Sequence, residues 1–143
     1  MTVQMVLSRK GSTVYTVEPT ATVSYAAKLL GEHGIGALVV TGPEGRTVGI
    51  ISERDIVRAI SHRGAAALEE PVSEIMTRKV VSCSTQDKLV DLMQHMTTGH
   101  FRHMPVTEEG RLIGIVSIGD VVKSRIEQIE QESNELREYI RSA

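Results

Sequence analysis

The distribution of apolar and polar residues along the chain predicts two adjacent strands with one helix before them and one after them. Apolar runs at 35–40 and 47–51 are separated by Gly42-Pro43-Glu44-Gly45, which is typical of a turn between strands. A helix is predicted ahead of the first run by four apolar residues at helical spacing: Ala26, Ala27, Leu29 and Leu30. Gly34 can end that helix, and a short β-rich segment at 14–17 precedes it.

The same pattern occurs a second time. The segment Gly49–Asp55 (GIISERD) recurs 65 residues later as Gly114–Asp120 (GIVSIGD), and each predicts a further helix that starts at its serine, Ser52 or Ser117. Apolar runs at 101–106 and 112–116 repeat the two strand segments. The helix ahead of these strands is also repeated. It is predicted from apolar residues at helical spacing, with Gly99 to end it: Leu89, Leu92, Met93 and Met96. A period this long with two copies indicates a duplicated domain.

The two copies are predicted to form one α+β module from halves of the order β-α-β-β-α. The boundaries are 2–64 and 71–125, joined by a linker at 64–71. A half of ~60 residues is marginal alone, so we expect the two sheets to pack together with helices outside. Duplication also predicts pseudo-two-fold symmetry and paired clefts. The segments Leu7–Lys10 and Met76–Lys79, upstream of the first strand segment of each half, resemble each other as well.

Residues 126–143 are predicted to form a helical extension. Apolar residues recur in and just before it at spacings of four and three, with Ser133 in one such place: Val122, Ile126, Ile129, Leu136 and Ile140. This heptad pattern allows the helix to fold back over its own module or to pair with a second chain. We favour a homodimer.

Composition narrows the function classes. The formal net charge of -2 argues against nucleic acid as a general partner. The single cysteine, Cys83, excludes an internal disulfide, fits a reducing compartment and is predicted to be a buried small residue. No apolar run approaches the ~20 residues of a membrane span. We therefore expect a cytoplasmic protein without a membrane partner.

The repeated Gly-x-x-Ser-x-x-Asp motif supports two interpretations. Ser52 and Ser117 can cap the helices that follow, with Asp55 and Asp120 completing capping boxes. In that case the module serves structure or dimerisation only. The same helix starts can bind a nucleotide, because helix N-termini attract phosphate and an Asp can accept hydrogen bonds from two ribose hydroxyls. The motif glycines would then let the ligand approach the strand backbone closely.

Four segments together resemble the cystathionine-β-synthase (CBS) domain family: Gly49–Asp55, Ile75-Met76-Thr77, His103-Met104-Pro105-Val106 and Gly114–Asp120. The resemblance extends over about residues 2–125 and implies a CBS pair, or Bateman module. It implies a regulatory sensor that binds AMP, ATP or NAD(H) and signals to a separate effector protein through ligand-dependent changes of module or dimer geometry. An enzyme is not expected, because the residues offer no oriented nucleophile, metal set or paired carboxylates.

The resemblance also implies a nucleotide site. The motif acids hold the ribose diol and the motif serines lie near ribose and phosphate: Asp55, Asp120, Ser52 and Ser117. The residues that open the first strand of each copy line the adenine: Thr16 and Ser82. Basic residues near the motifs are phosphate candidates: Arg54, Arg102 and His103. Ala37, the counterpart of His103, and Met104, which can pack against adenine or fill the core, complete the set. No metal is predicted, because the spacing of the nearby histidines is not a recognised zinc pattern.

Overall fold

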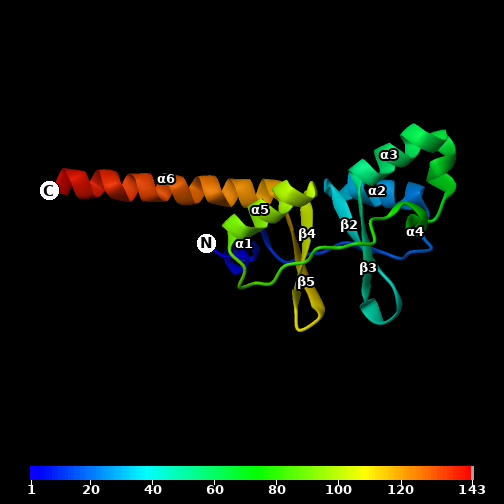
Figure 1. Ribbon diagram of the computed structural model, residues 1–143, viewed down its shortest axis with the longest axis horizontal. Helices are drawn as coiled ribbons and strands as arrows, with labels where there is room; N and C mark the ends of the chain where they lie inside the picture. Colours follow the sequence, from blue (N-terminus) through cyan, green and yellow to red (C-terminus); the bar gives the residue numbers. More distant parts are fainter. Residues whose placement is uncertain (143) are drawn as a thin grey trace. The chain divides into compact units, whose positions relative to one another are not determined.

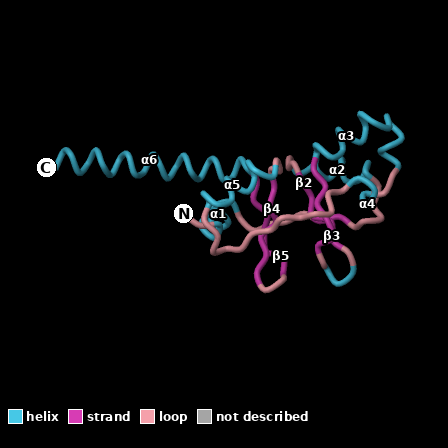
Figure 2. Tube along the Cα trace, viewed as in Figure 1, coloured by secondary structure: helices cyan, strands magenta, loops and turns pink. Residues whose placement is uncertain are grey.

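The computed structural model describes residues 1–142 and divides into two compact units. The first-copy unit comprises residues 13–81. The second-copy unit combines residues 1–12 with the chain from residue 82 onward. Figures 1 and 2 show the helices and strands of both units.

The first-copy unit contains a small sheet with helices packed against it. Its elements are β1 (Thr16–Val17), α2 (Val23–His33), β2 (Ala37–Thr41), η1 (Pro43–Gly45), β3 (Thr47–Ser52), α3 (Glu53–Arg63), η2 (Gly64–Glu69) and α4 (Val72–Ile75). The strand order is β1-β2-β3, with β1 parallel and β3 antiparallel to β2. The central strand β2 is buried from Ala37 to Val40, as its unbroken apolar run predicts.

The core of this unit is aliphatic because the chain has no Trp and one Phe. Its buried residues come from the strands, from α2 and α3, and from the segment that follows η2: Val17, Val23, Ala26, Leu30, Leu38, Val40, Ile51, Ile56, Val72 and Met76. Gly34 ends α2 in the left-handed region at φ 61°, which confirms its predicted role.

The second-copy unit repeats this arrangement with a two-stranded sheet in place of the three-stranded one. Its elements are α1 (Val3–Lys10), α5 (Leu89–Gly99), β4 (His103–Glu108), β5 (Arg111–Ser117) and α6 (Ile118–Ser142). β4 and β5 are antiparallel, and a single parallel bridge between Cys83 and Val106 stands where the first-copy unit has β1. Helices and strands share one core: Val3, Val6, Leu7, Cys83, Leu89, Leu92, Met96, Met104, Val106, Val116 and Val121.

Each unit includes the opening segment of the other copy. Helix α1 lies at the start of the first copy, yet it joins the second-copy unit, where Val3 N donates to Asp87 O and Leu89 N donates to Met1 O. In the same way Thr77, from the start of the second copy, pairs with Ile50 of β3 through two backbone hydrogen bonds at 2.8 and 3.0 Å. The predicted boundaries, 2–64 and 71–125, follow the sequence repeat, whereas the compact units are defined by this exchange of segments.

The structure changes several predicted element limits. Gly99 is the last residue of α5, as predicted, but the residue that caps the helix in the left-handed region is His100, at φ 57°. Helix α1 was not expected from the pattern. The predicted extension at 126–143 is the distal part of the continuous helix α6. Within residues 1–142, no helix is both long and apolar enough to cross a membrane.

Candidate functional site

The junction between β3 and α3 holds the first motif. Ser52 is the N-cap of α3: its hydroxyl accepts from Asp55 N at 3.2 Å, and Ser52 N donates to Asp55 Oδ2 at 2.9 Å. The Ser52 hydroxyl also lies 3.1 Å from the same carboxylate oxygen. This is the predicted capping box, and it fixes the Asp55 carboxylate beside the first turn of the helix.

The junction between β5 and α6 holds the second motif in the same geometry. Ser117 N donates to Asp120 Oδ2 at 2.9 Å, and Asp120 N donates to the Ser117 hydroxyl at 3.1 Å. Each junction is also tied to the residue before its neighbouring strand: Glu53 N donates to Gly36 O and Ile118 N donates to Arg102 O. The duplication has therefore kept both the acid and the backbone around it.

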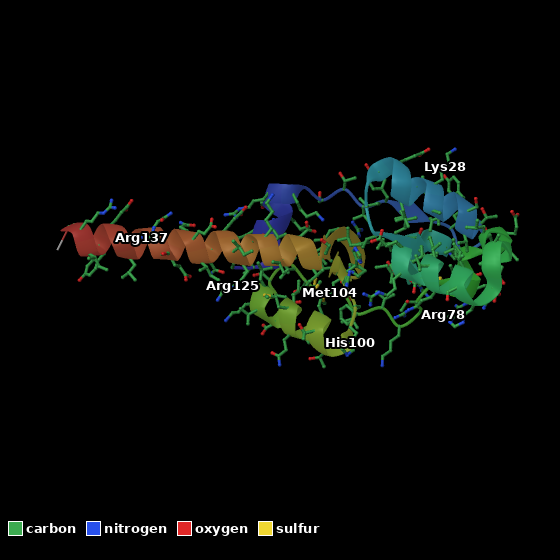
Figure 3. The ribbon with its side chains drawn as sticks, turned by 90° about the horizontal axis from the view of Figure 1, so that it is seen from above. Lys28, Arg78, His100, Met104, Arg125 and Arg137 are labelled. Atoms are coloured by element: carbon green, nitrogen blue, oxygen red, sulfur yellow. The ribbon has the colours of Figure 1, made fainter. Side chains whose placement is uncertain are left out.

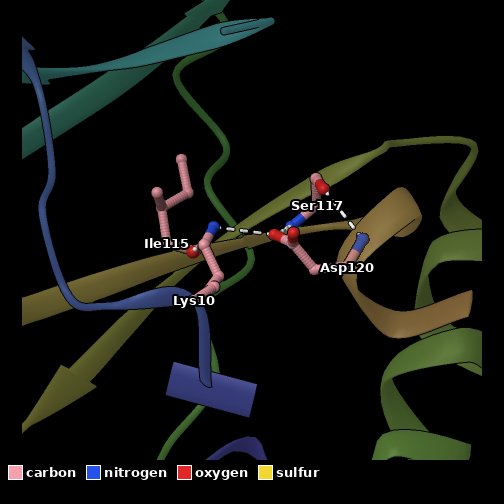
Figure 4. Close-up of polar contacts among 4 residues, drawn as sticks. All are labelled: Lys10, Ile115, Ser117 and Asp120. Carbon is pink, nitrogen blue, oxygen red and sulfur yellow. Dashed lines mark hydrogen bonds and ion pairs between the residues drawn. The ribbon is translucent and has the colours of Figure 1, made fainter. Parts of the chain in front are cut away.

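A lysine from α1 distinguishes the second junction. Lys10 Nζ donates to Asp120 Oδ2 at 2.7 Å and to Ile115 O at 2.9 Å (Figure 4). Partial burial acts to raise the pKa of Asp120, but the Lys10 and Ser117 hydrogen bonds and the Lys10 charge outweigh it, so the pKa lies below its ordinary value. Asp120 is therefore held as a carboxylate with a cation beside it.

The first junction has a neutral partner in the corresponding region. The Thr77 hydroxyl donates to Asp55 Oδ1 at 3.3 Å. Thr77 occupies this place because it forms the bridge to Ile50, the counterpart of Ile115. The two motif acids thus have similar caps but different charge environments. Neither Lys10 nor Thr77 was among the predicted site residues, although the similarity of Leu7–Lys10 to Met76–Lys79 marked both segments.

The motif glycines have a packing role that was not predicted. A Cβ on Gly49 would lie 2.7 Å from Met76 Sδ and 2.9 Å from Thr77 O, and a Cβ on Gly114 would lie 2.9 Å from Leu7 Cδ2. Glycine is required because the opening segment of the other copy crosses the strand here. Protein atoms therefore make the close approach on the Cβ side of both glycines.

Of the remaining predicted residues of the first-copy unit, Ala37 and Arg54 lie at the end of β3 and Thr16 lies on β1. Ala37 lies opposite Ser52 in the β2–β3 register, and Arg54 is half-buried in the first turn of α3. Thr16 is exposed at the start of β1, where it pairs with Val39. Ala37 is buried, so its side chain faces protein. A nearby groove of about 490 Å³ between α2 and α3 is lined mainly by apolar residues and includes none of the predicted site residues.

In the second-copy unit Arg102 and His103 lie at the corresponding end of β5. His103 faces Ser117 in the β4–β5 register and is half-buried, and Arg102 beside it is exposed. Ser82 is exposed next to the Cys83 bridge. Met104, labelled in Figure 3, is buried in the unit's core, which confirms the interpretation that it fills the core.

Cys83 is buried, as predicted, and takes no part in the junction. Its thiol donates to Pro105 O at 3.7 Å. Burial, with a smaller contribution from the charge of Asp87, raises the pKa of the thiol to about 12. The thiol is therefore protonated at neutral pH and contributes to packing.

Comparison with known proteins gives this geometry a family. The model of the CBS domain matches residues 9–62 and 72–127, which together form most of the chain and include both motif acids. The chain belongs to the CBS domain family. A CBS-domain-containing protein from Agrobacterium tumefaciens superposes with a TM-score of 0.86 at 50% identity, covering 87% of this chain and 99% of that chain. The resemblance inferred from the sequence, and the α+β fold of a CBS pair with two small sheets and a long C-terminal helix, are thereby confirmed.

Two other CBS domain structures similar to this chain contain ligands. A CBS domain protein from Pyrobaculum aerophilum, complexed with AMP, has a TM-score of 0.75 at 27% identity and covers 84% of this chain and 89% of that chain. The CBS domain pair of protein MJ0100, in complex with 5′-methylthioadenosine and S-adenosyl-L-methionine, has a TM-score of 0.80 at 25% identity and covers 90% of this chain and 98% of that chain. All three of these ligands contain an adenosine group.

Proposed function

We propose that this CBS domain pair binds an adenosine-containing ligand, with Asp55 and Asp120 accepting hydrogen bonds from ribose hydroxyls. The observation that carries the proposal is the equivalent placement of both carboxylates, each fixed by a serine at a strand–helix junction. Binding of AMP and of S-adenosyl-L-methionine by relatives supports the ligand class.

The capping interactions are compatible with this role. A carboxylate offers about four acceptor sites, and capping of the serine N–H uses one of them. At Asp55 the remaining donors are the Ser52 and Thr77 hydroxyls, which can turn toward other acceptors such as sugar oxygens. A ribose diol can thus share the carboxylate without unfolding the helix start.

The charges near the junctions favour a ligand with phosphate. Lys10 places a cation against Asp120, Arg102 directly precedes β4, and His103 at the start of β4 lies opposite Ser117. On the first-copy unit Arg54 lies in the same helical turn as Asp55. A phosphate-bearing adenosine such as AMP, ATP or NAD(H) therefore fits these groups better than a sulfonium such as S-adenosyl-L-methionine, whose charge would face cations.

The ligand acts as a signal in this proposal, and no turnover is assigned to the site. Occupancy can change the state of a separate effector protein only through the ligand's differential affinity for two arrangements of the module. The alternative function is a structural module in which both motifs are helix caps and nothing more. The capping boxes at Ser52 and Ser117 are the observation that supports this alternative.

Thermal unfolding separates the two functions. A ligand that binds the folded chain raises the midpoint, so AMP, ATP, NAD or NADH at saturating concentration should shift it upward, whereas GMP should not. Product analysis on the same samples should recover the nucleotide unchanged. No shift with any adenosine compound, including S-adenosyl-L-methionine, would leave only the structural function, and formation of a product would show an enzyme.

A further inference from the structure

Helix α6 carries an exposed apolar stripe that its own unit does not cover. Val122, Ile126, Ile129, Leu136 and Ile140 are 38% to 64% exposed. The helix contacts its core through Val121 and Ser124, which are buried, and every described residue from Ile129 onward is exposed. Figure 1 shows this distal part of α6 extending beyond the other elements of its unit. An apolar stripe of this length on an otherwise polar helix is a binding surface.

The spacing of the stripe defines a heptad register. The a positions of the heptad hold Ile126, Ser133 and Ile140, and the d positions hold Val122, Ile129 and Leu136. Side chains that flank such a seam pair with the flanking side chains of a partner helix. In α6 these flanking positions are charged except for Tyr139: Lys123, Arg125, Glu130, Glu132 and Arg137. Figure 3 shows Arg125 and Arg137 along the helix.

We infer that α6 pairs with α6 of a second copy as a parallel, in-register, two-stranded coiled coil. In a parallel pair each flanking residue faces the partner residue five positions further on. Arg125 then faces the partner's Glu130, and Glu132 faces the partner's Arg137. Symmetry repeats both contacts, so every charged contact of this type is attractive. The charges of one helix thus complement those of an identical helix in this orientation.

The antiparallel alternative brings like charges together. In the antiparallel register that covers the whole stripe, Ile126 packs on the partner's Leu136. The two-fold axis of the pair then passes near Gln131. Glu130 then faces the partner's Glu130, and Glu132 faces the partner's Glu132. Lys123 likewise faces the partner's Arg137. Sliding an antiparallel pair by one heptad relieves the repulsion only by leaving one end of the stripe uncovered.

Ser133 adds a second preference for the in-register pair. In the parallel arrangement Ser133 meets the partner's Ser133, so one polar residue meets another in the middle of the seam. In the antiparallel arrangement it meets the partner's Ile129. A single polar core position is a known device for fixing register at some cost in stability. The stripe from Val122 to Ile140 spans about 27 Å, nearly three heptads, so the pair is expected to be reversible.

Sedimentation of the full chain tests whether the stripe is the interface. We expect a concentration-dependent dimer that is at least tenfold weaker when Ile129 and Leu136 are both replaced by Lys. The matched control replaces Gln131 and Asn134, on the outer face of the same helix, by Lys, which adds the same charge and should leave the dimer unchanged. A wild-type chain that stays monomeric, or a dimer that tolerates the stripe substitutions, would overturn the proposal.

Disulfide trapping tests the orientation. Ile140→Cys places a thiol where two parallel helices meet, so mild oxidation should give a covalent dimer, while Glu138→Cys on the outer face should not. Cys83 is buried and should not compete. Exchanging the charges supplies a second test: Arg137→Glu should weaken the dimer severalfold, and adding Glu132→Arg should restore it. A dimer in which Ile140→Cys fails to cross-link, or in which Arg137→Glu strengthens association, would show that the helices are not parallel.

Discussion

Lys10 Nζ lies 2.7 Å from Asp120 Oδ2, whereas the equivalent carboxylate of Asp55 meets the Thr77 hydroxyl at 3.3 Å. The duplicated motif therefore presents one acid paired with a cation and one paired with a neutral donor. This difference arises from the exchanged segments, because α1 carries Lys10 to the second junction and the chain after α4 carries Thr77 to the first. The two junctions are expected to differ in both stability and ligand preference.

Removing the cation should cost stability in a pH-dependent way. The pKa of Asp120 is lowered in the folded chain, so its contribution is present above the ordinary carboxyl pKa and is lost as pH falls through the lowered value. Lys10→Met should therefore reduce the free energy of unfolding near pH 7 by about 1 kcal/mol or less. The difference from wild type should shrink below about pH 4.

Urea unfolding at several pH values measures this contribution. Lys79→Met is the matched control, because Lys79 is the counterpart of Lys10 in the repeated segment and is exposed. Its unfolding free energy should equal that of wild type at every pH. Equal stabilities of the Lys10→Met and wild-type chains at pH 7 would contradict the assigned role of the ion pair.

Lys10 should also set ligand charge preference at the second junction. A cation beside the ribose acid attracts a nearby phosphate, so Lys10→Met should lower the affinity for AMP relative to that for adenosine by roughly threefold to tenfold. Competition between AMP and adenosine, measured on the wild-type and Lys10→Met chains with Lys79→Met as control, gives this ratio. An AMP-to-adenosine ratio that does not change would show that phosphate lies away from Lys10.

Replacing either motif glycine by alanine should destabilise the chain, and the two losses should differ in size. In Gly49→Ala the new Cβ would meet backbone Thr77 O at 2.9 Å, which cannot move without breaking the bridge to Ile50. In Gly114→Ala it would meet the end of the Leu7 side chain, which can turn away. We expect Gly49→Ala to lose about 1–3 kcal/mol and Gly114→Ala to lose less.

A third glycine supplies the control for these measurements. Gly31 lies inside α2 with open space where a Cβ would be added, so Gly31→Ala should stabilise the chain by about 0.5–1 kcal/mol. Chemical denaturation of the three variants ranks them directly. A Gly49→Ala chain as stable as wild type would show that the Met76–Thr77 segment does not cross β3 closely.

The Cys83 thiol should be unreactive toward thiol reagents in the folded chain. A thiol with a pKa of about 12 has very little thiolate at pH 8, and burial blocks access to reagents. Ellman's reagent should therefore react slowly with the native chain and rapidly after unfolding in guanidinium. Rapid stoichiometric reaction of the native chain would place the thiol at the surface.

The sequence predicted the parts of this fold and site that depend on local pattern. The strands around the two turns, the end of α2 at Gly34, and the Ser52–Asp55 capping box all follow from spacing along a short stretch of chain. The second copy then doubled each signal, so the motif acids could be recognised without knowledge of their surroundings.

The parts that were missed depend on contacts between distant segments. Lys10 and Asp120 are 110 residues apart, and nothing in local periodicity places α1 against the second copy. The packing role of Gly49 was missed for the same reason. Met76 and Thr77, which lie against β3, follow α4 in the sequence. The cap of α5 was also missed, because His100 adopts a left-handed conformation that is usually taken by glycine.

Titration calorimetry with AMP most directly tests whether the motif acids bind ribose. The double variant Asp55→Asn, Asp120→Asn removes both carboxylates while keeping an oxygen that can serve each cap. Asp87→Asn is the matched control, because Asp87 accepts from Ser84 N at 2.8 Å in the same Ser-x-x-Asp spacing outside the junctions. The account predicts saturable binding to wild type and Asp87→Asn, and at least tenfold weaker binding to the double variant. Equal affinity in all three chains would contradict it.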